Sequence, residues 1–159
     1  MYINSHMSNL TNNYNFLSPT GFKLVINRNT LSNLEYFATS VTLPGLSLGQ
    51  VETPHQQYRG YISGDVTFDD FSIRIAMDED MNVYKELYDW IMKHRDTTDP
   101  IVYDATLMVL TNHNLPNNKI QFTNLFPTSV SGLEFSTQAT DVEYLQADVT
   151  FRYDYFKIL

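Results

Sequence analysis

Apolar and polar residues alternate most regularly near the C-terminal end of the chain, over residues 142–156. Every second position from Leu145 to Tyr155 carries an aliphatic or aromatic side chain, and the positions between them are mostly polar or charged. A period of two residues is typical of a β-strand with one buried face. The pattern therefore predicts one long strand, whose register is fixed by its apolar face and which must pair along its length.

Shorter alternating stretches predict further strands upstream. The first begins at Phe22, and a second spans 35–43 and ends at the turn dipeptide Pro44-Gly45. The pattern also predicts strands at 46–58, 65–77, 101–111, 119–125 and 129–136. Because residues 112–118 consist almost wholly of turn formers, we expect 101–111 and 119–125 to form a hairpin.

The segment 65–77 changes phase in its middle. Apolar residues occupy even positions up to Phe68 and odd positions from Phe71 onward. A one-residue phase change moves the apolar side chains to the other face, so we predict a β-bulge or bend at Asp69-Asp70. The sequence Ser-Gly-Asp at 63–65 favours a turn, which would pair 50–62 with 65–77 as a long hairpin.

One segment has the period of a helix. The apolar stripe follows the spacing i, i+3, i+4, i+7 and consists of Tyr84, Leu87, Tyr88 and Ile91, widened by Val83 and Trp90. Acids at 78–80 precede the stripe and bases at 93–95 end it, which complements the helix dipole. We predict one α-helix at about 80–95, and this role explains the acidic cluster without a metal.

Together these elements predict a mainly β fold of the α+β class, an antiparallel β-barrel or sandwich with one flanking α-helix. Residues 20–159 are expected to form a single domain, and a chain of this length buries roughly 70% of its unfolded surface. Residues 1–19 are rich in Asn, Ser and Thr and are expected to form a flexible N-terminal arm. Residues 1–6 are compatible with a tag remnant and carry no weight in the fold prediction.

Composition and charge narrow the range of partners. The chain has 10 Lys and Arg against 18 Asp and Glu, a formal net charge of −8, and no Cys. Non-specific binding to nucleic acid or to an anionic membrane needs a cationic surface, so both are disfavoured. No stretch approaches the roughly 18 apolar residues of a membrane span, and no secretory signal is visible, so we expect a protein that is cytosolic at synthesis.

No catalytic or metal-binding motif stands out. The four histidines lack the i, i+4 spacing that places two imidazoles on one metal, and the acidic clusters lack the glycine and distal Glu of a calcium loop. Nucleophile elbows, phosphate-binding loops and dinucleotide fingerprints are also missing. A pair of carboxylates from different strands leaves no sequence signature, so a glycosidase stays an alternative. We expect a protein that is not an enzyme and binds no metal or cofactor.

Five segments, in this order and spacing along residues 20–157, resemble the tail tube proteins of contractile-tailed (T4-like) bacteriophages. They are Leu43-Pro44-Gly45, the strand 67–73 leading into Met77-Asp78-Glu79, the helix end Asp89-Trp90-Ile91, the segment 125–130 and the final Tyr153-Asp154-Tyr155-Phe156. The same fold family includes the tube proteins of type VI secretion systems.

The resemblance implies a structural virion protein that forms hexameric rings, stacked into an inner tail tube through which DNA passes without specific binding. Its implied partners are further copies of itself, tail sheath proteins and baseplate proteins, with assembly in the host bacterial cytoplasm. Two alternatives stay open within the structural class: the tube of a type VI secretion or contractile injection system, and a baseplate tube initiator. A monomeric β-sandwich carbohydrate-binding module is the alternative from another class.

We assign subunit or ring contacts to two loops and a strand end. On this hypothesis the hairpin of roughly 50–77 belongs to the inner barrel, and the loops around Pro44-Gly45 and Tyr58-Arg59-Gly60 contact neighbouring subunits or rings. The full set of predicted interface residues is Leu43, Pro44, Gly45, Tyr58, Arg59, Gly60, Phe68, Asp69 and Asp70.

Overall fold

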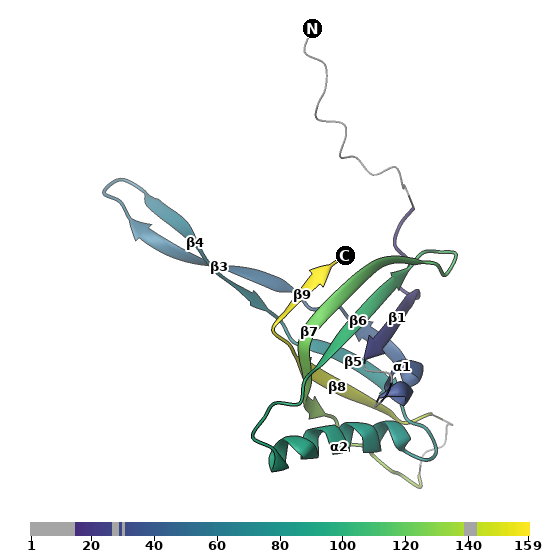
Figure 1. The fold of residues 1–159 in the computed structure, drawn as a ribbon. Coiled ribbons are helices and arrows are strands. Elements are labelled where there is room, and N and C mark those ends of the chain that lie inside the picture. Colours follow the sequence, from purple (N-terminus) through teal and green to yellow (C-terminus); the bar gives the residue numbers. More distant parts are fainter. Residues whose placement is uncertain (1–14, 27–28, 30, 139–142) are drawn as a thin grey trace.

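The computed structural model describes residues 15–26, 29, 31–138 and 143–159, and half of them belong to β-strands (Figure 1). The strands are β1 (Phe22–Ile26), β2 (Ala38–Thr42), β3 (Leu46–Pro54), β4 (Arg59–Phe68), β5 (Phe71–Ala76), β6 (Tyr103–Leu110), β7 (Pro116–Val130), β8 (Gln146–Arg152) and β9 (Tyr155–Ile158). The helices are α1 (Ser32–Phe37) and α2 (Asn82–Asp96). The predicted tag remnant and most of the predicted arm, residues 1–14, lie outside the described part, and Asn15–Ser18 have no regular structure.

Seven of the strands form one curved antiparallel sheet in the order β1-β6-β7-β8-β5-β2, with β9 also paired to β7. The long strand β7 joins its two halves, because its first part pairs with β6 and β9 and its last part, from Phe126, pairs with β8. At the junction Asn124 adopts a positive φ of 56°, a conformation that Asn tolerates well. Its backbone N–H donates to Asp104 Oδ1 at 3.2 Å, and its side-chain amide donates to Asp154 Oδ2.

The core lies on one face of this sheet, which packs against both helices. Phe71 of β5 stacks on Phe122 of β7, with ring centroids 4.5 Å apart. The other fully buried side chains come from β1, β5, β7, β8 and both helices, and include Leu24, Ile26, Leu34, Ile73, Ile75, Val83, Leu87, Leu125, Val149 and Phe151. The predicted mainly β fold, with antiparallel strands and few helices, is confirmed.

The helix predicted at about 80–95 is confirmed as α2, with a narrower buried stripe than its sequence suggests. Val83, Leu87 and Trp90 are buried, whereas Tyr88 is exposed. Both carboxylate oxygens of Asp78 accept hydrogen bonds from the first helical amides, those of Asn82 at 3.0 Å and Val83 at 3.3 Å. The acid ahead of the helix thus satisfies amides that have no partner within the helix.

A second, short helix corrects the prediction of a single one. Residues 35–37, expected to begin a strand, belong to α1, and β2 begins only at Ala38. Leu31 and Leu34 are buried, three residues apart, and Asn33 Nδ2 donates to Glu86 Oε1 of α2 at 2.6 Å. Packing against the core and α2 therefore outweighs the β-favouring alternation in this segment.

The predicted hairpin of 50–62 with 65–77 is wrong in its turn and in its second strand. The chain reverses at 55–58, so β3 pairs with β4, and β4 runs without interruption through residues 63–65. There the ladder has a register shift, and the backbones at Gly49 and Gly64 approach so closely that a Cβ on either would lie 3.3 Å from the other strand. The turn-forming residues 63–65 are used for this bulge.

Two further strand predictions need correction. No separate strand exists at 129–136, because β7 continues to Val130 and residues 131–138 have no strand. The C-terminal strand is interrupted after Arg152, where the Asp154 N–H donates to the Thr123 carbonyl at 3.0 Å. Its two parts, β8 and β9, pair with the two halves of β7, so the predicted pairing along the length of this segment is confirmed.

Candidate assembly interface

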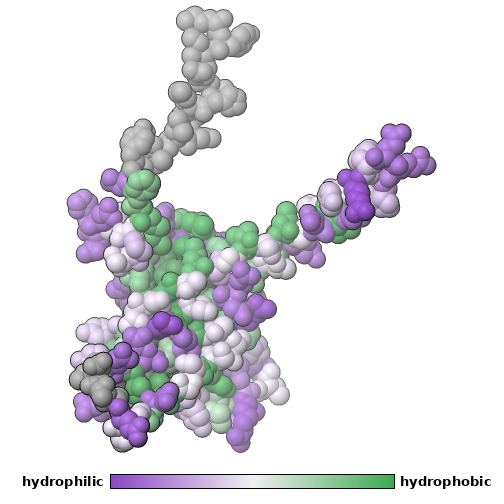
Figure 2. Space-filling model, turned by 180° about the vertical axis from the view of Figure 1, so that it is seen from behind, coloured by the Kyte–Doolittle hydropathy of each residue, from purple (hydrophilic) through white to green (hydrophobic). Residues whose placement is uncertain are grey.

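The β3–β4 hairpin projects away from the curved sheet as a separate two-stranded ribbon (Figure 1). Apolar residues are interspersed along its length, and hydrophilic residues gather at its tip (Figure 2). Six apolar side chains between base and tip are 51–62% exposed: Leu46, Leu48, Val51, Tyr61, Ile62 and Val66. An isolated two-stranded hairpin is at best marginally stable in water, so this ribbon needs a partner surface.

The exposed apolar side chains lie on both faces of the hairpin. Leu48 pairs with Val66 on one side of the bulge, and Val51 pairs with Ile62 on the other side. Because Leu48 and Val51 are three positions apart on one strand, they point to opposite faces. A single flat partner surface would therefore cover only part of this apolar area.

The base of the hairpin is bonded to the sheet by polar groups. The Asp69 N–H donates to the Gly45 carbonyl at 3.0 Å, and the Tyr153 hydroxyl donates to the Asp69 carbonyl at 2.8 Å. Arg152 pairs with Asp70, and its guanidinium also donates to the Phe68 carbonyl at 3.4 Å. These bonds fix the direction in which the hairpin leaves the domain.

Electrostatics reinforces the bond made by Tyr153. Burial raises the pKa of its hydroxyl to about 12, with the carboxylates of Asp69 and Asp70 acting in the same direction and Arg152 opposing them. The hydroxyl therefore keeps its proton, and its role as a donor, throughout the neutral range.

Aromatic packing completes the base. The ring of Phe68 lies 5.5 Å from that of Phe156 in an edge-on arrangement and 6.1 Å from that of Tyr153. Pro44 is buried beside this region, whereas Leu43 is exposed. Of the nine predicted interface residues, six therefore lie around the hairpin base: Leu43, Pro44, Gly45, Phe68, Asp69 and Asp70.

The other three predicted interface residues, Tyr58, Arg59 and Gly60, lie at the hairpin tip. Tyr58 stacks on His55 at 4.7 Å, and Arg59 Nε lies 3.1 Å from Glu52 Oε1. A Cβ at Gly60 would lie 2.7 Å from Thr53 Oγ1, so a larger residue there would require neighbouring side chains to shift. The nine predicted residues thus lie at the two ends of the hairpin, and their role in an interface stays a prediction. The exposed apolar residues between them were not in the predicted set, and their sequence signal is an alternation in which neither face is buried.

A second candidate interface is formed by the edges of part of the curved sheet. The run β2-β5-β8 and the last part of β7 are joined by antiparallel pairing, which makes four strands. Among the described residues, β2 pairs only with β5, and residues 126–130 of β7 pair only with β8. Both outer edges of this four-stranded run therefore present unpaired backbone groups, which are templates for pairing with another chain.

The directions of these two edge strands are complementary. Since neighbouring strands alternate, β2 and the last part of β7 run in opposite directions. A second copy related by rotation about an axis parallel to the strands would place its β2 antiparallel to this β7 edge. Of the segment 50–77, which the sequence hypothesis assigns to an inner barrel, β5 belongs to this four-stranded run, whereas β3 and β4 form the separate projecting hairpin. The inner-barrel assignment itself stays a prediction.

The titratable groups do not converge on a metal site in the part of the chain that the structure describes. No group of three or more His, Asp or Glu residues there could hold a metal ion. His94 bridges two backbone groups, with Nδ1 2.9 Å from the Trp90 carbonyl and Nε2 accepting from the Ile101 N–H at 3.3 Å. Neither described helix is long and apolar enough to cross a membrane.

The curved sheet, the flanking helix and the projecting hairpin together define a tail-tube-like fold. No protein-family model and no curated protein sequence matches the chain, whereas solved structures do. A chain in the structure of the anti-feeding prophage's tube-terminating cap superposes with a TM-score of 0.73 at 14% identity, covering 98% of both chains. These values show that the fold is shared over almost the whole length.

Two further structures extend this likeness. A chain of the sheath–tube complex of an extracellular contractile injection system in its extended state gives a TM-score of 0.71 at 16% identity and covers 90% of both chains. A type six secretion system protein gives 0.55 at 13% identity and covers 86% of this chain and 81% of the other. The fold expected from the sequence resemblance is therefore confirmed.

Proposed function

We propose that the protein is a non-enzymatic structural subunit of the tube in a contractile particle. The observation that carries the proposal is the four-stranded sheet with two open edges of opposite direction, which rotation can join into a closed barrel. The shared fold supports the same role, because its solved relatives include a tube-terminating cap and a sheath–tube complex.

Ring closure would join β7 of each subunit to β2 of the next and leave no free edge in the barrel. Six copies of a four-stranded sheet would supply about 24 strands, and barrels of about 16 strands already enclose an aqueous channel. A hexameric ring of this kind is therefore wide enough for a conduit. Stacked rings would form the tube, with sheath proteins outside it and baseplate proteins at one end.

The hairpin supplies contacts that edge pairing alone does not provide. Its apolar residues on both faces fit a position between neighbouring subunits, where each face meets a different surface. Burying six half-exposed side chains at about 25 cal/mol per Å² would add several kcal/mol to each contact.

The particle itself is either a phage tail, in which DNA would pass through the tube, or an injection system. The sequence resemblance favours the tail, and the origin of the two most similar folds described above favours an injection system. In either case the protein would be assembled in the bacterial cytoplasm and end up as a component of the particle. Portal genes beside its own gene would select the phage tail.

Electron microscopy of the purified protein at rising concentration tests the proposal. Rings with a central hole, or hollow tubes, are the expected result. The variants Val51→Lys and Ile62→Lys should fold normally and fail to assemble, because both side chains are exposed in the subunit. Tyr88→Lys, which places the same charge on an exposed position of α2, is the matched control and should assemble.

Each substitution lowers the net negative charge by one, so a loss of assembly in the hairpin variants could not come from increased repulsion. A wild-type protein that stays monomeric even after seeding with tube ends would contradict the proposal and favour the carbohydrate-binding alternative.

A further inference from the structure

The four-stranded sheet formed by β2, β5, β8 and the last part of β7 has one face turned away from the core, and this outer face of the subunit carries its charges in a crossed arrangement. On β5 the outward positions include Ser72 and Arg74, and on β8 they include Asp148, Thr150 and Arg152. Arg74 of β5 pairs with Asp148 of β8, and Arg152 of β8 pairs with Asp70 just ahead of β5. β8 thus contributes one base and one acid, β5 contributes a base, and Asp70 ahead of β5 supplies the second acid, so the two ion pairs carry no net charge.

Hydroxyl groups occupy most of the remaining outward positions. Thr42 on β2 pairs in register with Ser72, which pairs with Thr150, which pairs with Ser129 on β7. This row of hydroxyls separates the two ion pairs. The face has two arginines, two aspartates and no net charge, whereas the chain as a whole has a formal charge of −8.

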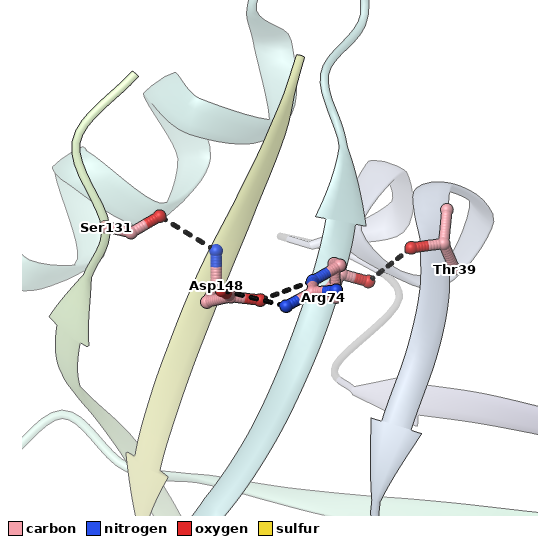
Figure 3. A network of polar contacts seen from close by, with 4 residues as sticks. All are labelled: Thr39, Arg74, Ser131 and Asp148. Atoms are coloured by element: carbon pink, nitrogen blue, oxygen red, sulfur yellow. Dashed lines mark hydrogen bonds and ion pairs between the residues drawn. The ribbon is translucent and has the colours of Figure 1, made fainter. Parts of the chain in front are cut away.

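The Arg74–Asp148 pair is held in a defined geometry. Arg74 Nε donates to Asp148 Oδ1 at 2.7 Å and its terminal nitrogen donates to Oδ2 at 3.2 Å, which is a two-point contact. Figure 3 shows that flanking hydroxyls bind the backbone of both residues: the Thr39 hydroxyl donates to the Arg74 carbonyl, and the Asp148 N–H donates to Ser131 Oγ. The hydrogen bond from Arg74 also lowers the pKa of the Asp148 carboxyl, with burial opposing it, so the carboxylate stays charged in mildly acidic solution.

Stability alone gives little reason for these pairs. Both side chains of the Arg74–Asp148 pair are more than half exposed, and exposed ion pairs contribute only about 0–1 kcal/mol. Their effect on the electrostatic potential is larger if the face lines a channel, because a concave surface focuses the field of its charges.

We infer that Asp148 and Asp70 are masking residues: they neutralise Arg74 and Arg152 on the face that lines the channel, so that a polyanion such as duplex DNA passes without being held. The inference rests on the proposed function. If the ring closes through the β2 and β7 edges, one of the two faces of the four-stranded sheet must line the channel. The core face is covered by the rest of the domain, so the charged face is the one that lines the channel. An unmasked arginine would be repeated in every subunit of every ring. Each phosphate bound by such a cation releases counterions and strengthens binding in a salt-dependent way.

The test uses assembled tubes and a short fluorescent DNA duplex, measured by co-sedimentation at about 50 mM and about 500 mM salt. Wild-type tubes should retain no DNA above background. Asp148→Asn tubes should retain at least tenfold more at low salt and lose it at high salt. The double variant Arg74→Gln with Asp148→Asn should return to the wild-type level, because the cation is removed together with its mask.

A matched control makes the same charge change on the outside of the subunit. Asp96 pairs with Arg95 at the end of α2 at 3.6 Å, so Asp96→Asn also unmasks one arginine. Its tubes should bind no more DNA than wild type. If Asp148→Asn alone prevents assembly, tubes co-assembled from variant and wild-type subunits carry the same unmasked Arg74 at lower density and are measured instead.

The outcomes separate the two proposals. Wild-type tubes that form normally, with Asp148→Asn tubes, pure or co-assembled, retaining no more DNA than Asp96→Asn tubes, would overturn the masking inference and leave the tube proposal intact. Retention of DNA by wild-type tubes would also overturn it. A wild-type protein that forms no rings or tubes would refute the proposed function itself, and the inward orientation of this face with it.

Discussion

Phe68 joins the projecting hairpin to the domain, and its replacement by alanine tests whether the aromatic base holds the hairpin in place. The ring contacts Tyr153 and Phe156 and is packed against the edge of the core. In Phe68→Ala both ring contacts are lost, while the backbone bonds of the base remain available. The polar contribution to the base is therefore left unchanged by this substitution.

The expected loss follows from the degree of burial. Truncation of a fully buried Phe costs about 3–5 kcal/mol, and Phe68 is only partly buried, so about half of that, ~2 kcal/mol, is expected. Two aromatic contacts at about 0.5–1.5 kcal/mol each give a similar value. For a domain of this size, ~2 kcal/mol corresponds to a decrease in Tm of about 4–8 °C.

Thermal unfolding and amide hydrogen exchange measure this effect. If the loss falls on the hairpin, its amides should exchange about 30-fold faster at ~2 kcal/mol, while those of the core sheet change less. Tyr153→Phe is the matched control: it keeps the ring and removes only the hydrogen bond to the Asp69 carbonyl, for about 1 kcal/mol. A Tm within 1 °C of wild type for Phe68→Ala, with unchanged exchange in the hairpin, would refute the anchoring role.

Three further predictions concern titratable groups. The pKa of Tyr153 is about 12 in the folded protein and about 10 in an unfolded chain, so the stability that its protonated hydroxyl contributes is complete below pH 10 and lost as the pH rises towards 12. A pH series of Tm values should show this loss in wild type and not in Tyr153→Phe. Burial acts to raise the pKa of Asp78, but hydrogen bonds from the Asn82 and Val83 amides outweigh burial and lower the pKa. The stabilisation that the Asp78 carboxylate gives the folded protein is therefore present above pH ~4 and lost below it. Asp78→Ala should lower the unfolding free energy by about 1 kcal/mol at pH 7, and an unchanged urea midpoint would contradict the capping role. Burial raises the pKa of Glu86, against hydrogen bonds from Asn33, and the Oε2 atom of Glu86 is buried without a hydrogen-bond partner. Glu86→Gln should therefore raise Tm at pH 7.5. This gain should shrink as the pH falls towards 4, because the wild-type carboxylate then takes up a proton.

Elements whose pattern is local and long could be predicted from the sequence. The helix at 82–96 has four turns of one apolar stripe, and the strand at 146–152 has an uninterrupted alternation. The short helix α1 has only Leu31 and Leu34 as a helical signal, too few to outweigh the alternation that follows. Its helical state depends on α2, which is distant in the sequence.

The misplaced hairpin turn has a different origin. Ser-Gly-Asp at 63–65 has strong turn chemistry, whereas the actual reversal at 55–58 contains no glycine. Gly64 is favoured because a Cβ there would lie 3.3 Å from the Gly49 backbone across the ladder, a contact that no sequence window of one strand contains. Close approach between two strands and turn formation both select glycine, so the residue type alone does not separate them.

The candidate site could be predicted only in part for the same reason. Both ends of the hairpin carry local signals, Pro44-Gly45 and the phase change at Asp69-Asp70. The two ion pairs join residues that are distant in the sequence: Arg74 and Asp148 are separated by 74 positions, and Arg152 and Asp70 by 82. Such pairs depend on the register of β5 against β8, which is set by the whole sheet.

The two open sheet edges raise the question of why the subunit would not pair at random. Each edge strand is irregular: β2 has a register shift between Ala38 and Ser40, and β7 has one between Pro127 and Ser129, beside a proline that cannot donate a backbone hydrogen bond. Bulges and prolines weaken an edge as a template, and a net charge of −8 keeps dilute subunits apart. In the proposed ring, edge pairing would therefore follow the docking of the hairpin, which holds the edges of two subunits in register, so that assembly proceeds on an existing ring faster than between free subunits.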